Sequence, residues 1–252
     1  MTLNWFKFAS PATFYPLAGR LTRPFWILTG VLLVIGLYWG FFQTADQLGG
    51  SNPQKEYYRI IFIHVPAAWM SMWLYIVLVF WAAIGLVFNT RLSFMMANAV
   101  APTGAVFTFL ALWTGAFWGR PSWGTYWDWD PRLTSELVLF FLYIGYMALH
   151  SAIDDTRRAD RASALLAIVG LVMVPVIYWS INCPDPTQCA ALHQRSGLGK
   201  IESNILFSML TMTLAFWMYS FATSFMRLRS IILTREAEAS WVQELLSQEQ
   251  VR

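Results

Sequence analysis

The residues of this chain best suited to chemistry are two histidines and a run of tryptophans. His64 and His193 are far apart in the sequence, and residues 123–130, here called the tryptophan-rich segment, read Trp-Gly-Thr-Tyr-Trp-Asp-Trp-Asp. A neutral imidazole is a common axial ligand of haem iron, and two imidazoles fill both axial positions. Indole rings offer flat contact area to a porphyrin. These residue types together predict a haem site.

Charged residues beside the tryptophan-rich segment fit the same ligand. Arg120 and Arg132 flank the segment, and arginine suits bidentate contacts with carboxylates such as the two haem propionates. Asp128 and Asp130 are expected either to cap the following helix or to accept from indole N–H groups, and for Asp130 a cap near Leu133 is the favoured role. Glu136 is expected to be stabilised by the same helix N-terminus and is assigned no catalytic role.

Each of these features also has an interpretation without a ligand. The tryptophans are compatible with an interfacial aromatic belt, which accounts for Trp118 and Trp123 better than for the dense run at 123–129. His64 alone is equally compatible with a hydrogen bond to a neighbouring helix, and Pro66 either opens the helix beside it or only kinks it. A single loop histidine such as His193 is often just solvated.

The elements that must position these residues are membrane helices. The chain is 57% hydrophobic and only 12% charged, against about 25% charged residues in a usual soluble domain. Crossing a bilayer takes about 20 apolar residues, and none of the long apolar runs alternates as a strand would. The sequence therefore predicts an all-α, polytopic fold with six transmembrane helices, at about Phe25–Phe42, Ile60–Phe88, Phe94–Trp118, Leu133–Ser151, Ala162–Ile181 and Ile205–Met226.

The distribution of basic residues predicts the orientation of the helices. With both termini cytoplasmic, eleven Lys and Arg lie on the inner side and six on the outer side, as the positive-inside rule requires. His64, His193 and the tryptophan-rich segment then share the outer side, whereas His150 lies at the inner end of the fourth span. His150 is expected to complement the C-terminus of its helix. The net charge of +3 gives no indication of nucleic-acid binding.

The whole chain, 1–252, is interpreted as one membrane domain. Residues 1–24 form a cytoplasmic N-terminal segment without the features of a cleavable signal peptide. The outer side carries loops at 43–59, 119–132 and 182–204. The tail at 228–252 is cytoplasmic, and apolar residues at near-helical spacing predict a short helix lying on a surface: Trp241, Val242, Leu245 and Leu246.

Residues 123–137, with the sequence WGTYWDWDPRLTSEL, resemble the tryptophan-rich signature of the haem-handling proteins of cytochrome c maturation, and more narrowly that of the CcmC family. The stretch from Arg59 to Trp69 is similar to the first histidine region of that family, and Leu192-His193-Gln194 is similar to its second. The resemblance implies that His64 and His193 are the axial ligands. It implies a haem-binding surface made of Trp123, Trp127, Trp129 and Asp130, beside which Trp118, Arg120 and Arg132 are further candidates for contact with haem.

The resemblance also implies a function. Proteins of this family hold non-covalent haem b at the periplasmic face of the bacterial inner membrane and deliver it to a CcmE-like haem chaperone. The implied partners are a CcmA-like ATPase, a CcmB-like membrane subunit, a CcmD-like small subunit and membrane lipid. Covalent attachment takes place on the partner, so this chain is not expected to be an enzyme.

Two cysteines flank a proline-containing turn before the second histidine. Cys183 and Cys189 are expected to form a structural disulfide, because an oxidising periplasm favours one. A thiol ligand for haem and a transient redox role remain as alternatives. The spacing is not Cys-x-x-Cys-His, so it does not predict covalent haem attachment here.

Two other classes of membrane protein remain open at this stage. A haem b electron carrier would hold its two histidines between facing helices, whereas only His64 lies within a predicted span on the outer side. A small-molecule permease would show paired broken helices or charged residues near the midplane. Pro102 and Pro175 are expected to interrupt spans three and five, but no charged residue lies beside either of them.

Overall fold

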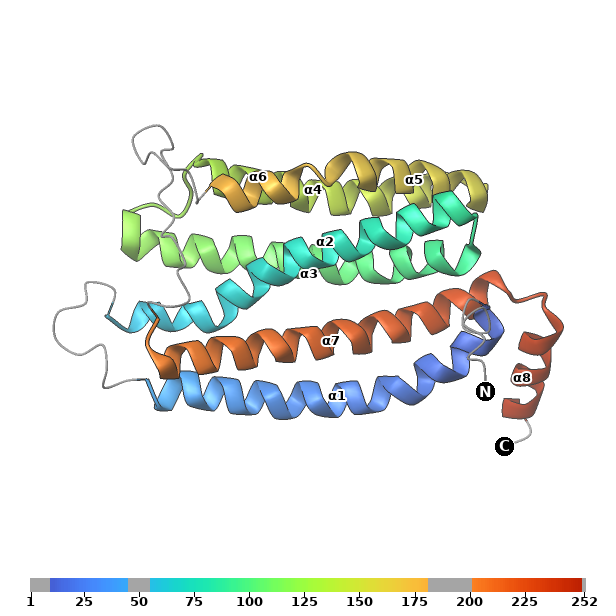
Figure 1. Cartoon of the computed structure of the whole chain (residues 1–252), viewed down its shortest axis with the longest axis horizontal. Coiled ribbons are helices and arrows are strands. Elements are labelled where there is room, and N and C mark those ends of the chain that lie inside the picture. Colours follow the sequence, from blue (N-terminus) through green and yellow to red (C-terminus); the bar gives the residue numbers. More distant parts are fainter. Residues whose placement is uncertain (1–9, 45–54, 181–200, 251–252) are drawn as a thin grey trace.

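The computed structural model describes residues 10–44, 55–180 and 201–250. Long helices run side by side along one axis (Figure 1). Their bounds are α1 Pro11–Phe42, α2 Ile61–Phe88, α3 Arg91–Trp123, α4 Pro131–Ala152, α5 Thr156–Gly170, α6 Met173–Ser180, α7 Ser203–Arg235 and α8 Ser240–Gln250, with a 3-10 helix, η3, at Lys55–Ile60.

The described residues contain six segments long and apolar enough to span a membrane, which confirms the all-α, six-helix prediction. Large apolar side chains face outward on these segments, including Ile27, Val34, Val87 and Val169, each at least 66% exposed. Such a surface suits lipid, because a helix satisfies its backbone hydrogen bonds within itself and leaves only side chains to face hydrocarbon. The chain is therefore a multi-pass membrane protein.

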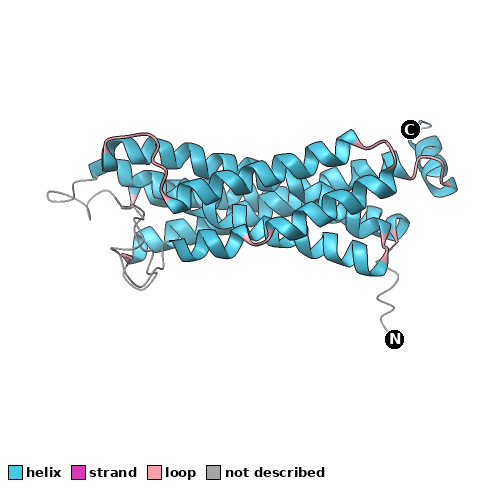
Figure 2. Ribbon diagram, turned by 90° about the horizontal axis from the view of Figure 1, so that it is seen from above, coloured by secondary structure: helices cyan, strands magenta, loops and turns pink. Residues whose placement is uncertain are grey.

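The helices pack as a central pair with neighbours on either side. α2 and α3 form the middle of the bundle, α1 packs mainly on α7, and α4 packs on α5 and α6. Figures 1 and 2 show that α1 begins and α7 ends at the same end of the bundle, where α8 lies across the helix axes. The opposite end carries the start of α2, the end of α3 and the start of α4. This opposite end of the bundle is called the α2 end.

The fifth span is two helices rather than one. α5 ends at Gly170 and α6 begins at Met173. Pro175 has no backbone N–H and its ring would clash with the carbonyl of Leu171, so the helical ladder is interrupted there. The amide of Leu171 bonds instead to the carbonyl of Ile168, at 3.2 Å. Pro102 has no such effect, because α3 runs through it without a break.

Four helices extend well beyond the spans that hydropathy predicts: α1, α3, α5, which begins at Thr156 rather than Ala162, and α7, which ends at Arg235 rather than Met226. α1 begins at Pro11, so Arg20 and Arg23 lie on the helix and not in a preceding segment. α3 continues past Trp118 to Trp123. Polar residues and Pro121 lower the apolar character there, but they do not stop the backbone from continuing as a helix. The helix predicted in the tail forms as α8 and buries Val242 completely, whereas the cytoplasmic location of the tail stays a prediction.

Candidate functional site

His64 lies in the first turn of α2, at the α2 end of the bundle, and only 6% of it is exposed. Its Nδ1 is 3.0 Å from Oγ1 of Thr114 on α3. The same Oγ1 is 2.6 Å from the carbonyl oxygen of Leu110, to which it donates its one hydrogen. Thr114 must therefore accept from His64, which places the proton of the neutral ring on Nδ1 and the lone pair on Nε2.

This arrangement is the one found around histidines that ligate metals. A ligating ring usually donates its other N–H to a nearby acceptor, which fixes both the tautomer and the orientation of the ring. The sequence left two interpretations of His64, a ligand or a hydrogen bond to a neighbouring helix. The structure shows the helix-to-helix bond, and that bond orients the second nitrogen for a ligand rather than competing with it.

A small pocket adjoins His64 between α2, α3 and α4. Its free volume is about 30 Å³, whereas pockets that enclose a ligand usually measure about 300–1,000 Å³. The pocket holds water-sized groups and cannot enclose a porphyrin. It is lined by His64, Ala68, Ala111, Leu112, Gly115, Trp123, Arg132, Leu133 and Glu136.

A glycine makes room for the imidazole in this pocket. A Cβ added to Gly115 would lie 3.0 Å from Cε1 of His64. That separation is tighter than ordinary contact, so a larger residue at Gly115 would displace the ring. Gly115 and Thr114 are neighbours on α3, and together they fix the position and the hydrogen bonding of His64.

Glu136 also lines this pocket, a role that was not predicted from the sequence. Its side chain is 5% exposed, and Oε1 accepts a hydrogen bond of 2.6 Å from the hydroxyl of Ser71. Its Oε2 has no hydrogen-bond partner within the described residues. An acidic residue in an apolar span is costly, and that cost was the signal available in the sequence. The prediction that Glu136 is merely stabilised by the N-terminus of its helix did not take this cost into account.

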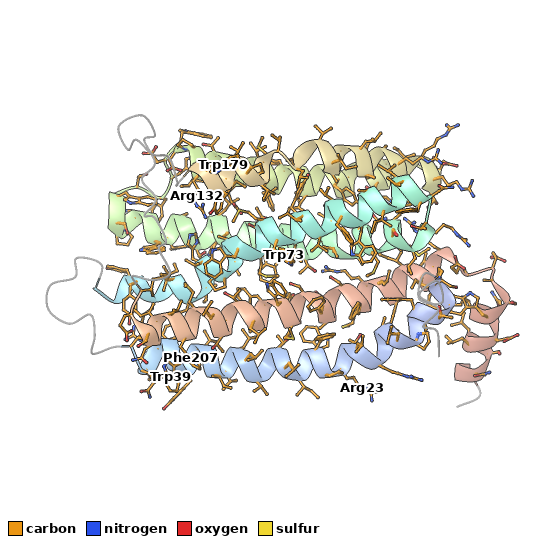
Figure 3. The ribbon with its side chains drawn as sticks, in the orientation of Figure 1. Arg23, Trp39, Trp73, Arg132, Trp179 and Phe207 are labelled. Atoms are coloured by element: carbon orange, nitrogen blue, oxygen red, sulfur yellow. The ribbon has the colours of Figure 1, made fainter. Side chains whose placement is uncertain are left out.

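Arg132 brings a positive charge to the same pocket. It lies on the first turn of α4, and its Nη1 donates to the carbonyl oxygen of Ile177 on α6, at 3.3 Å. Figure 3 shows Arg132 near the α2 end of the bundle, on the side of α4 and α6 where Trp179 also lies. Arg132 and His64 thus line the same pocket, whereas the predicted contact of Arg132 with a haem propionate stays a prediction. Arg120 is exposed and donates to the carbonyl oxygen of Gly124.

The tryptophan-rich segment begins where α3 ends. Gly124 ends the helix with a φ of 85°, in the left-handed region that favours glycine, and its amide bonds to the carbonyl of Arg120 at 3.0 Å. Trp118 stands edge-on to His64, with ring centroids 5.6 Å apart and an interplanar angle of 84°. Trp123 lines the pocket. Two of the predicted tryptophans thus lie beside the histidine, and both lie on α3.

The other two tryptophans do not form a single flat surface. The rings of Trp127 and Trp129 are 5.5 Å apart at an interplanar angle of 82°. In this arrangement only one of them can lie flat against a given porphyrin face. Trp129 is 73% exposed, so its ring is available for contact with a ligand or another protein.

Asp130 caps α4, as predicted. Its carboxylate accepts a 2.8 Å hydrogen bond from the amide of Leu133, and the residue is 3% exposed. It therefore holds the end of the tryptophan-rich segment to the start of α4. That is a positioning role, distinct from the direct contact that the family resemblance implies.

His150 lies at the opposite end of the bundle. Its Nε2 is 3.0 Å from Oδ1 of Asp160 and 2.9 Å from Nη2 of Arg235. With Asn98 of α3, whose Nδ2 lies 3.1 Å from the same Nε2, its surroundings are a polar cluster of four helices and not only the C-terminus of α4. His193, Cys183 and Cys189 lie outside the described residues, so the second ligand and the disulfide stay predictions.

Comparisons with known proteins give one consistent family. The family model described as "Heme exporter protein C" matches residues 4–243. A protein of that name from Escherichia coli K12 is 41% identical over 242 residues, covering 95% of both chains. One from Bradyrhizobium diazoefficiens is 39% identical over 231 residues, covering 92% of this chain and 86% of its own. One from Haemophilus influenzae is 37% identical over 244 residues, covering 94% and 95%.

Proposed function

The chain belongs to the CcmC family of haem exporter C proteins, and on that basis we propose that it binds haem at the α2 end and delivers it to a CcmE-like chaperone. Membership places the chain in haem export and cytochrome c maturation, as a multi-pass membrane component. The proposal adds the ligand, its site and its recipient.

The observation that carries this proposal is the hydrogen bonding of His64. Thr114 fixes the proton on Nδ1, which gives Nε2 the lone pair that an iron ligand needs. Because both residues are buried, water does not compete for this bond. His64 is thereby ordered before haem binds, so little rotational freedom is lost on binding.

The size of the pocket suggests how haem is held. The pocket beside His64 is too small for a porphyrin, so binding of iron by Nε2 would require α2, α3 and the tryptophan-rich segment to move apart, with the exposed Trp129 offering contact area to the ring. Arg132, with Arg120 on the loop side, would pair with the propionates, and His193 would supply the second axial ligand. Non-covalent haem b held in this open way remains accessible to a partner. We assign no catalytic step to this chain, because its task is transfer.

Absorption spectra of purified variants test the ligand assignment. His64→Ala and His193→Ala should each shift the Soret band and reduce transfer to the chaperone. His150→Gln is the control, because it removes an imidazole at the opposite end but keeps a polar side chain toward Asp160. An unchanged spectrum in both outer variants would exclude the assignment.

The site is proposed to face the periplasm, with both termini in the cytoplasm and the chain in the bacterial inner membrane. Single cysteines at Ser122 and Ser196, in a background without Cys183 and Cys189, should react with a membrane-impermeant thiol reagent in intact cells. A cysteine at Ser151, exposed at the other end of the bundle, should react only after permeabilisation. Labelling of Ser122 and Ser196 on opposite sides would rule out a shared haem.

The alternative functions receive less support. Within the described residues the histidines are His64, in the first turn of α2, and His150, in the last turn of α4, and these two do not face each other across the bundle as in a haem b electron carrier. A permease with paired broken helices is not favoured either, because only the fifth of the described spans is broken.

A further inference from the structure

A basic pocket lies at the end of the bundle opposite His64, where α1, α7 and α8 meet. Its volume is about 660 Å³, within the range of sites that enclose a ligand. Three arginines line it: Arg20 and Arg23 of α1, and Arg229 of α7. Trp241 and Leu245 of α8 line its other side. We call it the α1–α8 pocket.

Arg229 is held in place by uncharged groups. Its Nη2 donates to the hydroxyl of Tyr15 at 3.0 Å, and its Cζ lies 4.4 Å from the centroid of the Tyr15 ring. Gly19 allows the guanidinium to lie close to α1, since a Cβ there would be 3.1 Å from Cζ. These contacts orient the guanidinium but leave its charge uncompensated.

Acidic residues of the described part of the chain do not pair with the three arginines. Within the described residues, none of Arg20, Arg23 and Arg229 forms an ion pair, although other arginines at this end do. Arg91 pairs with Glu236 at 3.0 Å, and Arg235 pairs with Asp160 at 2.8 Å. Concentrated positive charge at the mouth of a pocket attracts an anion. The ligand of this pocket should therefore be anionic.

The surface of α1 next to the pocket indicates which kind of anion. Arg20, Arg23, Ile27, Val31 and Val34 follow one another at helical spacing and so lie on one face. Ile27, Val31 and Val34 are 66%, 50% and 70% exposed. Figure 3 shows Arg23 projecting from α1 on the side away from α7. A headgroup at the arginines would place acyl chains along this apolar stripe.

We propose that the α1–α8 pocket binds the phosphate of an anionic phospholipid. Arg20, Arg23 and Arg229 contact the phosphate, and the stripe that continues through Ile27 carries the acyl chains. α8 closes the pocket as a helix lying in the membrane surface. Its Trp241 ring, 6.0 Å from that of Tyr15, occupies the headgroup level, where tryptophan is enriched.

Native mass spectrometry of the full-length protein in detergent tests this proposal. Cardiolipin, phosphatidylglycerol or phosphatidylcholine is added, and the lipid retained is compared for the wild type and Arg20→Gln/Arg23→Gln. Both arginines are exposed, so the double variant is expected to fold. Arginines near a membrane surface contribute enough that losing two should reduce retention of the anionic lipids by about tenfold. Phosphatidylcholine should be retained weakly by both proteins.

A matched control separates site binding from net charge. Arg157→Gln/Arg158→Gln removes two exposed arginines from α5 at the same end of the bundle, and it should retain anionic lipid as the wild type does. Equal loss in both double variants, or no loss in either, would overturn the proposal. Millimolar inorganic phosphate distinguishes the two sources of phosphate. If inorganic phosphate fails to displace the lipid, the site is a lipid site. If phosphate displaces the lipid and occupies the pocket to the same extent, the site binds soluble phosphate instead.

Discussion

Replacing Thr114 by valine tests whether the hydrogen bond to His64 prepares the ring for iron. In the variant the ligating tautomer must bury its Nδ1–H without the threonine acceptor that stands 3.0 Å away. His64 and Thr114 are 6% and 8% exposed, so water cannot replace the hydroxyl freely. A buried donor deprived of its acceptor costs about 1–3 kcal/mol. At about 1.4 kcal/mol per factor of ten, haem affinity should fall roughly 5- to 150-fold.

The assay is a titration of the purified chain with haem, followed by Soret absorbance. Thr108→Val is the matched control, since Thr108 is also buried on α3 and bonds to the carbonyl of Gly104, but not to His64. It should change haem affinity little. Thr114→Ser keeps the hydroxyl and should restore most of the affinity. If Thr114→Val binds haem as tightly as the wild type while His64→Ala does not, the hydroxyl does not position the ligand.

Three further predictions follow from the same structure. Replacing the three indoles of the tryptophan-rich segment by alanine should lower haem occupancy, measured by the spectrum, and transfer, measured as haem recovered on the chaperone. Trp113→Ala, at an exposed position within α3, should lower neither. If the triple variant transfers haem as well as the wild type does, the segment is only an interfacial belt. Asp160→Ala should destabilise the fold by about 3–5 kcal/mol in thermal unfolding, because it leaves the charge of Arg235 without its partner, and the haem spectrum of the folded fraction should stay unchanged. Cys183 and Cys189 should resist alkylation when no reductant is added. If both thiols react freely although they face the periplasm, no bridge is present.

The sequence alone was sufficient for the class of protein and for much of the site. Six long apolar stretches can satisfy their backbone groups in lipid only as helices, so the fold class follows from hydropathy. The Asp130 cap was predictable because capping depends on residues three positions apart. The family follows from residues 123–137, whose unusual composition is itself the signal. The sequence marks both Pro102 and Pro175 as places where a helix can be interrupted, but only the structure shows that the break occurs near Pro175 and not at Pro102.

Only the tertiary structure shows what each side chain contacts. Thr114 lies 50 residues from His64, and nothing local to either predicts that the two helices pack in a register that joins them. Glu136 enters the pocket because α4 packs against α2 through Ser71. The perpendicular rings of Trp127 and Trp129 depend on the path of the backbone after Gly124. Hydrophobic pattern specifies which helices form, because it depends on neighbours along the chain, whereas side-chain packing between helices decides which residues meet.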